Sequence, residues 1–307
     1  MLSLIEEIIS ELADTEKPLG NSRLSDLTSL NSEELADFKK LWRDIDPERR
    51  RQVMLRLVEL AEENFELDFD SIFKSCLDDP DDEVRSKAIE GLWENEELNL
   101  INYLLDLLQN DPSDKVQAAA ATALGRFTLL AEQQKLPANY HPKIYQALLG
   151  ILNDSRKPVE VRRRALEAIA PMDSGEVEQI ISTAYRSSQP KLRVSAIYAM
   201  GKNCNPQWLP ILLREMGNRN AEIRYEVACA CGEIGDEEAV DGLVELVDDS
   251  DLEVQLAAIR ALGKIGNTEA KNCLEQCLDD VSEAIQMAAE DALREIDAGE
   301  EPGLFTL

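Results

Sequence analysis

The sequence has few aromatic side chains, a single histidine and no long apolar run. Aromatic residues make up 5% of the 307 residues and hydrophobic residues 44%, so aliphatic and small side chains have to fill the core, which favours closely packed helices. No run of about 18 apolar residues occurs, which excludes a membrane-spanning helix. The N-terminus carries Glu6 and Glu7 where a signal peptide has basic residues. We therefore expect a soluble, cytoplasmic protein.

Basic residues are also scarce. The 32 Lys and Arg face 61 Asp and Glu, which leaves a formal net charge of -29. An electrostatic field of this sign repels phosphate and anionic lipid. The charge therefore disfavours nonspecific nucleic-acid binding and gives no sign of membrane binding.

Histidines and closely spaced cysteines, which often carry catalysis or bind metals, are few. His141 is the only histidine, so any Ser-His-Asp or Cys-His arrangement has to use it, and no nucleophile-elbow sequence is present. The six cysteines show no C-x-x-C spacing. Cys273 and Cys277 share a helix face, which leaves a metal or thiol-exchange role open beside the interpretation we prefer, buried thiols acting as small apolar residues. We expect no cofactor and identify no catalytic set.

One segment recurs along the chain. The run DLEVQLAAIRALGKIG contains Val254, and equivalent apolar residues follow at intervals of 31 or 32, with one longer step of 45. The leading residues of these copies are Val84, Val116, Val161, Leu192, Ile223, Val254 and Ile285. A degenerate copy near Arg49 brings the total to eight. A fixed period in this range predicts a solenoid of stacked units.

Each copy has the pattern of a closely packed helix. The fourth and seventh residues after the leading one are mostly Ala, and the eighth is a larger apolar residue. These offsets share one helical face, and small residues there let neighbouring helices approach to about 8–10 Å. We expect the glycines at the ninth position to end the helices; they are Gly125, Gly201, Gly232 and Gly263. Another helix is readable between successive copies, so each repeat is expected to be an antiparallel helix pair in which the aligned copy is the second helix.

The pattern D-x-x-V-(R/Q)-x-x-A-x-x-A-L-G-x-I-G, as in residues 251–266, resembles the HEAT-like repeats of bacterial proteins, including phycobilisome-lyase-type chains. The resemblance implies an all-α fold, a right-handed α-solenoid of about eight helix pairs whose second helices line the concave face. It leaves function open, because such proteins include scaffolds, chromophore lyases, hydroxylases and DNA glycosylases. A HEAT-repeat di-iron hydroxylase needs His-Glu pairs on several repeats, which one histidine excludes.

The resemblance also divides the chain. Residues 1–30 are expected to form an N-terminal capping helix and a link, residues 31–297 the repeat solenoid, and residues 298–307 a disordered tail. The long step of 45 residues contains about fourteen inserted residues, which we interpret as a lengthened helix followed by a loop, PANYHP. Insertions of this kind in solenoids are either binding elements or tolerated surface loops.

The middle of the chain is locally basic. Residues 151–230 hold twelve basic and nine acidic side chains, a net charge of +3. Repeat arginines can pair with an Asp of a neighbouring turn; Arg162 and Arg193 lack such an Asp, whereas Arg224 can reach Asp251. Arg and Tyr are enriched at binding hot spots, and guanidinium groups suit carboxylate or phosphate. The predicted partner-binding residues of the concave face are Arg162, Arg163, Arg164, Arg193, Tyr198, Arg224, Tyr225 and Arg260.

These observations favour a non-enzymatic scaffold or adaptor for protein-protein interaction, because the repeat supplies surface and no catalytic set. The partner is expected to present an acidic segment or a small anionic group. An alternative is a subunit of a bilin (chromophore) lyase-type or isomerase complex, in which a tetrapyrrole's propionates would meet the arginines. A DNA-repair glycosylase is a further alternative, disfavoured by the net charge and by having three tryptophans in separate repeats.

Overall fold

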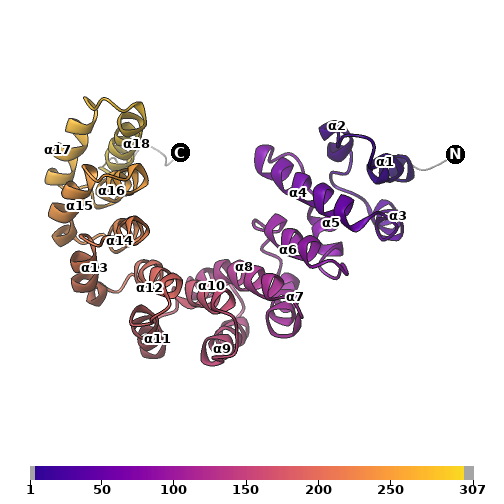
Figure 1. Ribbon diagram of the computed structural model, residues 1–307, viewed down its shortest axis with the longest axis horizontal. Helices are drawn as coiled ribbons and strands as arrows, with labels where there is room; N and C mark the ends of the chain where they lie inside the picture. Colours follow the sequence, from indigo (N-terminus) through magenta and orange to yellow (C-terminus); the bar gives the residue numbers. More distant parts are fainter. Residues whose placement is uncertain (1–3, 301–307) are drawn as a thin grey trace, which may run out of the picture. The chain divides into compact units, whose positions relative to one another are not determined.

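The structure is a computed structural model that describes residues 4–300 (Figure 1). Within those residues the chain forms eighteen α-helices and two short 3-10 helices, and no strand. The all-α fold predicted from the sequence is confirmed. No helix in this part of the chain combines the length and the apolar character needed to cross a membrane.

The chain divides into two compact units, and the division falls between Ala168 and Ile169, at the end of α10. The helices of the first unit are α1 (Leu4–Ala13), α2 (Asn21–Ser25), α3 (Ser32–Trp42), α4 (Pro47–Glu63), α5 (Asp70–Ser75), α6 (Asp82–Gly91), α7 (Leu98–Asn110), α8 (Asp114–Glu132), α9 (Tyr140–Asn153) and α10 (Val159–Ile169).

The second unit continues the same order of helices. Its members are α11 (Gly175–Tyr185), α12 (Pro190–Asn203), η1 (Pro206–Trp208), α13 (Leu209–Glu215), α14 (Ala221–Ile234), η2 (Glu237–Ala239), α15 (Val240–Val247), α16 (Leu252–Ile265), α17 (Thr268–Cys277) and α18 (Glu283–Glu300).

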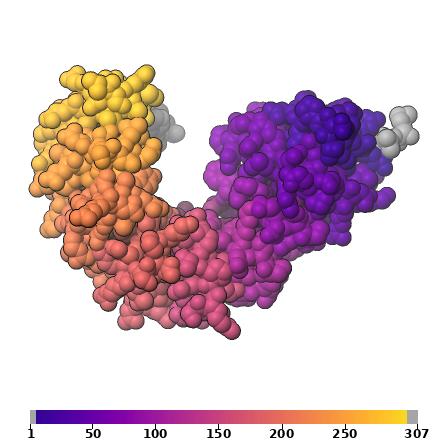
Figure 2. Space-filling model, viewed as in Figure 1, coloured from indigo at the N-terminus to yellow at the C-terminus, as the bar shows by residue number. Residues whose placement is uncertain are grey.

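Each unit has two layers of helices. The first-helix layer holds the first helix of each repeat, and the second-helix layer holds the second helix, which is the repeated segment of the sequence. In the first unit the second helices α4, α6 and α8 pack on one another in order, while α5 packs on α6 and α7 on α8. In the second unit α12, α14, α16 and α18 form the corresponding layer, and α11, α13, α15 and α17 pack against it. Figure 2 shows that segments close in sequence pack against one another within each unit. The eight predicted copies are the even-numbered helices α4 to α18, so the α-solenoid is confirmed.

Several of these helices have an N-cap side chain at their first turn. Asp81 accepts hydrogen bonds from the backbone N–H groups of Glu83 and Val84 at the start of α6. Asp251 accepts from the equivalent N–H groups of α16. A carboxylate at this position satisfies N–H groups that have no partner inside the helix. The acidic residues between repeats therefore set where the second helices begin.

The glycines at the ninth position do not end helices, contrary to the expectation from the sequence. Gly232 lies inside α14, which ends at Gly235 with φ of 72°. A Cβ at Gly232 would lie 2.9 Å from the Cα of Ala261 on α16. Gly125, Gly201 and Gly263 likewise face Ala168, Ala230 and Ala292. These glycines bring the backbones of adjacent second helices together.

Helices form much of the described ends and of the insertion. Helix α1 packs on α3 and α4 and buries Ile5, Ile8, Ile9 and Leu12. The link contains α2. At the other end α18 runs to Glu300, so residues 298–300, predicted as tail, are helical; residues 301–307 lie outside the described residues. Helix α8 is lengthened to 19 residues, but His141 lies in the first turn of α9, not in the loop.

Candidate functional site

Several repeats carry an arginine directly after the leading apolar residue, and in two of them this arginine donates hydrogen bonds to the turns between helices. Arg85 donates two hydrogen bonds of 2.9 Å to the Asp111 carboxylate and one of 2.7 Å to the carbonyl of Asp79. Glutamines at the same repeat position donate to turn carbonyls instead; they are Gln117, Gln255 and Gln286. This repeat position therefore connects a second helix to the turns beside it.

Arg224 has the same arrangement. It donates to the Asp249 carboxylate over 2.6 and 2.7 Å and to the carbonyl of Asn218 over 2.7 Å. The expectation that Arg224 pairs with Asp251 is wrong, because the Asp251 carboxylate caps α16. The hydrogen bonds from Arg224 hold the pKa of Asp249 below its ordinary value. The guanidinium of Arg224 is thus used within the second unit.

Arg193 and Arg162 differ from these arginines. At the turn position where Arg224 finds Asp249, Arg193 has Asn218, and its guanidinium carbon lies 5.7 Å from the ring centroid of Tyr185. It also neighbours the buried Glu215: burial works to raise the pKa of Glu215, but hydrogen bonds and the charge of Arg193 lower it overall. Arg162 is half-buried, and its Nε is buried without a hydrogen-bond partner.

Arg163 and Arg164 are held along α10 by two glutamates of the same helix. Arg163 lies 3.0 Å from Glu160. Arg164 lies 3.0 Å from Glu160 and 2.9 Å from Glu167. Pairs three and four residues apart face each other on a helix, so the local excess of positive charge on α10 is partly balanced.

The remaining predicted residues lie on the second-helix layer of the second unit. The Nζ of Lys202 lies 5.7 Å from the ring centroid of Tyr198. The half-buried Tyr225 has its pKa raised by Cys229 and by burial, while the charge of Arg260 on the adjacent helix works in the opposite direction. Tyr225 on α14 and Arg260 on α16 thus belong to adjacent second helices.

The eight predicted residues divide between the two units. Arg162, Arg163 and Arg164 belong to the first unit, and the other five to the second. Within the second unit, Arg193 lies in the N-terminal half of α12, Arg224 and Tyr225 lie in the N-terminal half of α14, and Arg260 lies in the C-terminal half of α16. A common role of these residues in binding a partner stays a prediction.

A hollow of about 920 Å³ on the second-helix layer of the first unit was not predicted from the sequence. It is lined by side chains of α4, α6, α7, α8 and α10. Its apolar part includes Leu100, Leu104 and Phe127 from the core and the small side chains Ala119 and Ala123. Sites with an apolar floor of this size are typical of ligand and anchor-residue binding.

Trp93 explains why the hollow opens here. It stands nine residues after Val84, at the repeat position that holds glycine in four other copies. Helix α6 ends at Gly91, and Trp93 is 50% exposed. The glycine-to-alanine contact that joins other second helices is therefore missing opposite Ala123. A tryptophan at a glycine position is the sequence signal that would have indicated the hollow.

The rim of the hollow carries charges of both signs. Lys115 is ion-paired with Glu83, and Arg126 lies 3.2 Å from Glu96. Arg164, one of the predicted residues, also lines the hollow. An apolar floor with a polar rim is the composition of protein-protein interfaces, so this arrangement is suited to binding.

The described residues offer little for metal or thiol chemistry. In residues 4–300 no group of three or more His, Cys, Asp or Glu side chains could hold a metal ion. Cys76 and Cys231 are buried, and burial raises the pKa of each to about 12, so both stay protonated at neutral pH. Cys273 and Cys277 share one face of α17, and both are free thiols.

Comparisons with known proteins agree with the repeat architecture. A family model described as HEAT repeats matches residues 70–159 and 209–294. The chain is 26% identical over 188 residues to a deoxyhypusine hydroxylase of Candida albicans, which covers 55% of this chain and 59% of that enzyme. It is 29% identical over 106 residues to the deoxyhypusine hydroxylase of Drosophila melanogaster, which covers 34% of this chain and 35% of that enzyme. The matches thus span less than two thirds of these relatives' length.

A solved structure with the same fold is the complex of CpcE and CpcF of phycocyanin lyase from Nostoc sp. PCC7120. It aligns with a TM-score of 0.53 and 16% identity, and the alignment covers 93% of this chain and 97% of that chain. At this level of identity the likeness is one of fold.

Proposed function

The chain belongs to the HEAT-repeat family, and from this we propose that it is a non-enzymatic scaffold that binds a protein partner through its second-helix layer. The hollow around Trp93 is the observation that carries the proposal. Interfaces obtain most of their binding energy from a few aromatic or Arg anchors in well-packed, desolvated pockets. Trp93 is 50% exposed above an apolar floor, which leaves its indole available to a partner.

The shape of the hollow suits a partner helix or a short apolar segment. Ala119 and Ala123 have small side chains on α8, so the backbone of a partner can come close to that helix. Phe127 and the leucines below then contact its side chains. The mixed charges of the rim favour a partner with both acidic and basic residues around an apolar centre.

The test compares two exposed aromatic residues of the first unit. Trp93→Ala removes the anchor, and Ala119→Arg fills the hollow. Phe65→Ala is the control, because Phe65 is 79% exposed and lies outside the hollow. We expect affinity purification from the native cell to recover a partner with the wild-type chain and with Phe65→Ala, and to lose it with the other two variants. Retention of the same partner by both variants would refute the proposal.

The predicted arginines contribute a second part of the same proposal. We propose that Arg162 and Arg193 contact carboxylates of the partner, because neither side chain has the turn aspartate that Arg85 and Arg224 use. Arg162 is half-buried and its Nε has no hydrogen-bond partner, so its guanidinium is not held by a turn in the way that Arg85 and Arg224 are.

Charge reversal tests the role of these arginines. We expect Arg162→Glu with Arg193→Glu to abolish binding of the recovered partner, measured by calorimetry. The matched control reverses Arg186 and Arg219, which are both exposed. Unchanged binding in the first double variant, with thermal denaturation showing that it is folded, would remove these residues from the interface.

A second candidate is a subunit of a bilin lyase-type complex. The fold likeness to phycocyanin lyase and a hollow of about 920 Å³ support it, with Arg126 and Arg164 at the rim as partners for propionates. Mixing the purified protein with a bilin should then shift the visible absorption band, and Trp93→Ala should reduce the shift. An unchanged spectrum would exclude this candidate.

We do not propose the activity of the deoxyhypusine hydroxylases. A di-iron centre built from His-Glu pairs needs several histidines, and this chain has His141 alone. Its Nε2 lies 2.8 Å from Glu132, between the end of α8 and the start of α9. The residues present therefore do not fit such a centre.

A further inference from the structure

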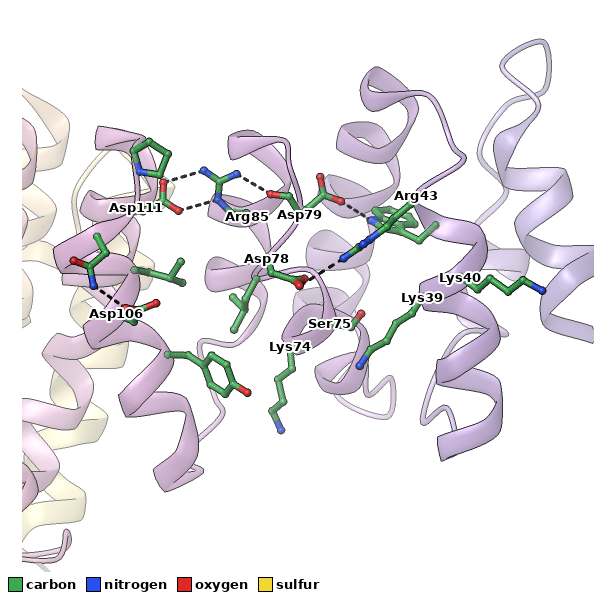
Figure 3. Close-up of a pocket in the computed structure, with 16 residues that line it drawn as sticks. Lys39, Lys40, Arg43, Lys74, Ser75, Asp78, Asp79, Arg85, Asp106 and Asp111 are labelled. Carbon is green, nitrogen blue, oxygen red and sulfur yellow. Dashed lines mark hydrogen bonds and ion pairs between the residues drawn. The ribbon is translucent and has the colours of Figure 1, made fainter.

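A second hollow, of about 900 Å³, lies on the first-helix layer of the first unit (Figure 3). Its side chains come from α3, α5 and α7, from the turns that follow these helices and, with Arg85, from α6. Helix α5 has six residues, whereas α3 has 11 and α7 has 13. The short helix leaves the flanks of its two neighbours uncovered, which creates the hollow.

The floor of this hollow combines apolar and aromatic side chains. Leu77, Leu107 and Pro112 contribute apolar surface, and Tyr103 is 60% exposed. An exposed tyrosine next to apolar side chains is the kind of residue that anchors a bound peptide.

Positive charge gathers around this floor. Lys39, Lys40, Arg43 and Lys74 all line the hollow. In Figure 3, Lys39 from α3 and Lys74 from α5 extend toward the same space. Among residues 4–300, neither Lys39 nor Lys40 is in an ion pair. Lys74 is half-buried, and its Nζ lies 2.7 Å from Glu97 and 4.0 Å from Asp70. Ion pairs that are partly open to solvent contribute little stability.

The hollow has two buried carboxylates and two exposed ones. Asp79 accepts from Trp42 Nε1 over 2.8 Å and from Arg50, and Asp111 is held by Arg85. Asp79 and Asp111 are buried, so their charges are balanced inside the fold. Asp78, at 3.7 Å from Arg43, and Asp106 face solvent. Lys39 and Lys40 are therefore the positive charges of the hollow that no ion pair balances among the described residues.

We propose that this hollow binds a short acidic segment of a protein partner, with carboxylates on Lys39 and Lys74 and an apolar side chain against Tyr103. This surface is separate from the one in the proposed function. The net charge of -29 does not prevent such binding, because charges farther apart than about 8 Å are largely screened at physiological ionic strength. A peptide with spaced acids avoids Asp78 and Asp106, whereas a continuous phosphate backbone meets them, which disfavours a nucleic acid.

The test measures fluorescence anisotropy with the full chain and a fluorescein-labelled peptide of alternating glutamate and leucine. We expect binding that weakens with added salt. Lys39→Glu with Lys74→Glu should lower the affinity by about tenfold or more. The matched control is Lys135→Glu with Lys143→Glu, which changes the net charge equally at two exposed lysines of the same unit.

The outcomes separate the alternatives. An equal loss in the control pair would show an effect of overall charge and overturn the proposal, as would absence of binding to the wild-type chain. Stronger binding of a single-stranded oligonucleotide that displaces the peptide would assign the hollow to nucleic acid and overturn it too. Peptide binding unchanged by Trp93→Ala is expected, and keeps this result distinct from the test of the proposed function.

Discussion

Single ion pairs connect the turns of this protein to its second helices. The Arg224–Asp249 pair is nearly buried, with side-chain exposures of 13% and 7%. A hydrogen bond to a charged group contributes about 1.5–3 kcal/mol, and removing one partner leaves the other unsatisfied. Pairs of this kind therefore stabilise the link between α14 and the turn before α16.

The Asp249 pair gives the protein a dependence of stability on pH. Because Arg224 lowers the pKa of Asp249 in the folded state, the contribution is complete above the unfolded value of about 3.9 and is lost as the pH falls through the lower, folded pKa. Asp249→Asn should lower the free energy of unfolding at neutral pH by about 1–3 kcal/mol. It should then lose less stability than the wild type on acidification.

Urea denaturation at neutral pH and at about pH 3 checks this prediction. The control is Asp241→Asn, an exposed side chain on α15, which should keep the wild-type profile. Parallel profiles for wild type and Asp249→Asn would contradict the assignment.

The sequence indicated that repeat arginines pair with turn aspartates, but it did not identify the right aspartate. Asp249 and Asp251 are two residues apart in one turn. The choice between them depends on backbone direction: Asp251 points its carboxylate at the N–H groups of α16, which leaves Asp249 for Arg224. A pattern of residue types contains no such direction, so only the fold resolves it.

At the scale of helices, the period of 31 residues correctly predicted where the second helices lie. It led to a wrong prediction for the glycines, which lie inside the helices and do not end them. A glycine inside a helix and a glycine just after one look alike in a single sequence. The structure distinguishes the two kinds of glycine. Gly232 faces Ala261 on the adjacent helix, whereas Gly235 has φ of 72° and caps the end of α14. The hollow near Trp93 was missed for a related reason, since it lies where α6 and α8 lack the glycine-to-alanine contact of the other second helices.

Substitution of two helical glycines tests this interpretation. A Cβ at Gly201 would lie 2.7 Å from the Cα of Ala230, a backbone atom that cannot move aside cheaply. Gly201→Ala should therefore lower the free energy of unfolding by about 1–3 kcal/mol. Gly150→Ala, on α9 with nothing within 4 Å, should raise it by up to about 1 kcal/mol. Thermal and urea denaturation measure both, and equal effects would contradict the close-contact role.

At the scale of the whole molecule, the large negative charge opposes folding through self-repulsion. Sodium chloride raised from about 10 mM to about 200 mM shortens the Debye length from about 30 Å to less than 10 Å. We therefore expect the thermal midpoint, followed by circular dichroism, to rise over this range. Glycine at the same concentration is the control, because a zwitterion does not screen. A fall in the midpoint would mean that the ion pairs outweigh the repulsion.

The fold could be predicted from the sequence because the same pattern of apolar and small residues recurs in eight copies. The two hollows could not, because they depend on individual departures from the repeat. Trp93 at a glycine position and the six-residue α5 are such departures, and each one alters the spacing between neighbouring helices. The predicted arginines lie in both units, so their common use is a matter for the binding experiments.

The placement of Trp93 has an optical consequence. Trp42 and Trp208 are 3% and 4% exposed, whereas Trp93 is 50% exposed. Collisional quenchers such as acrylamide will therefore act mainly on the emission of Trp93. A molecule that enters the hollow shields this indole and shifts its emission to shorter wavelength, so the protein carries a built-in fluorescent sensor of whether that surface is occupied.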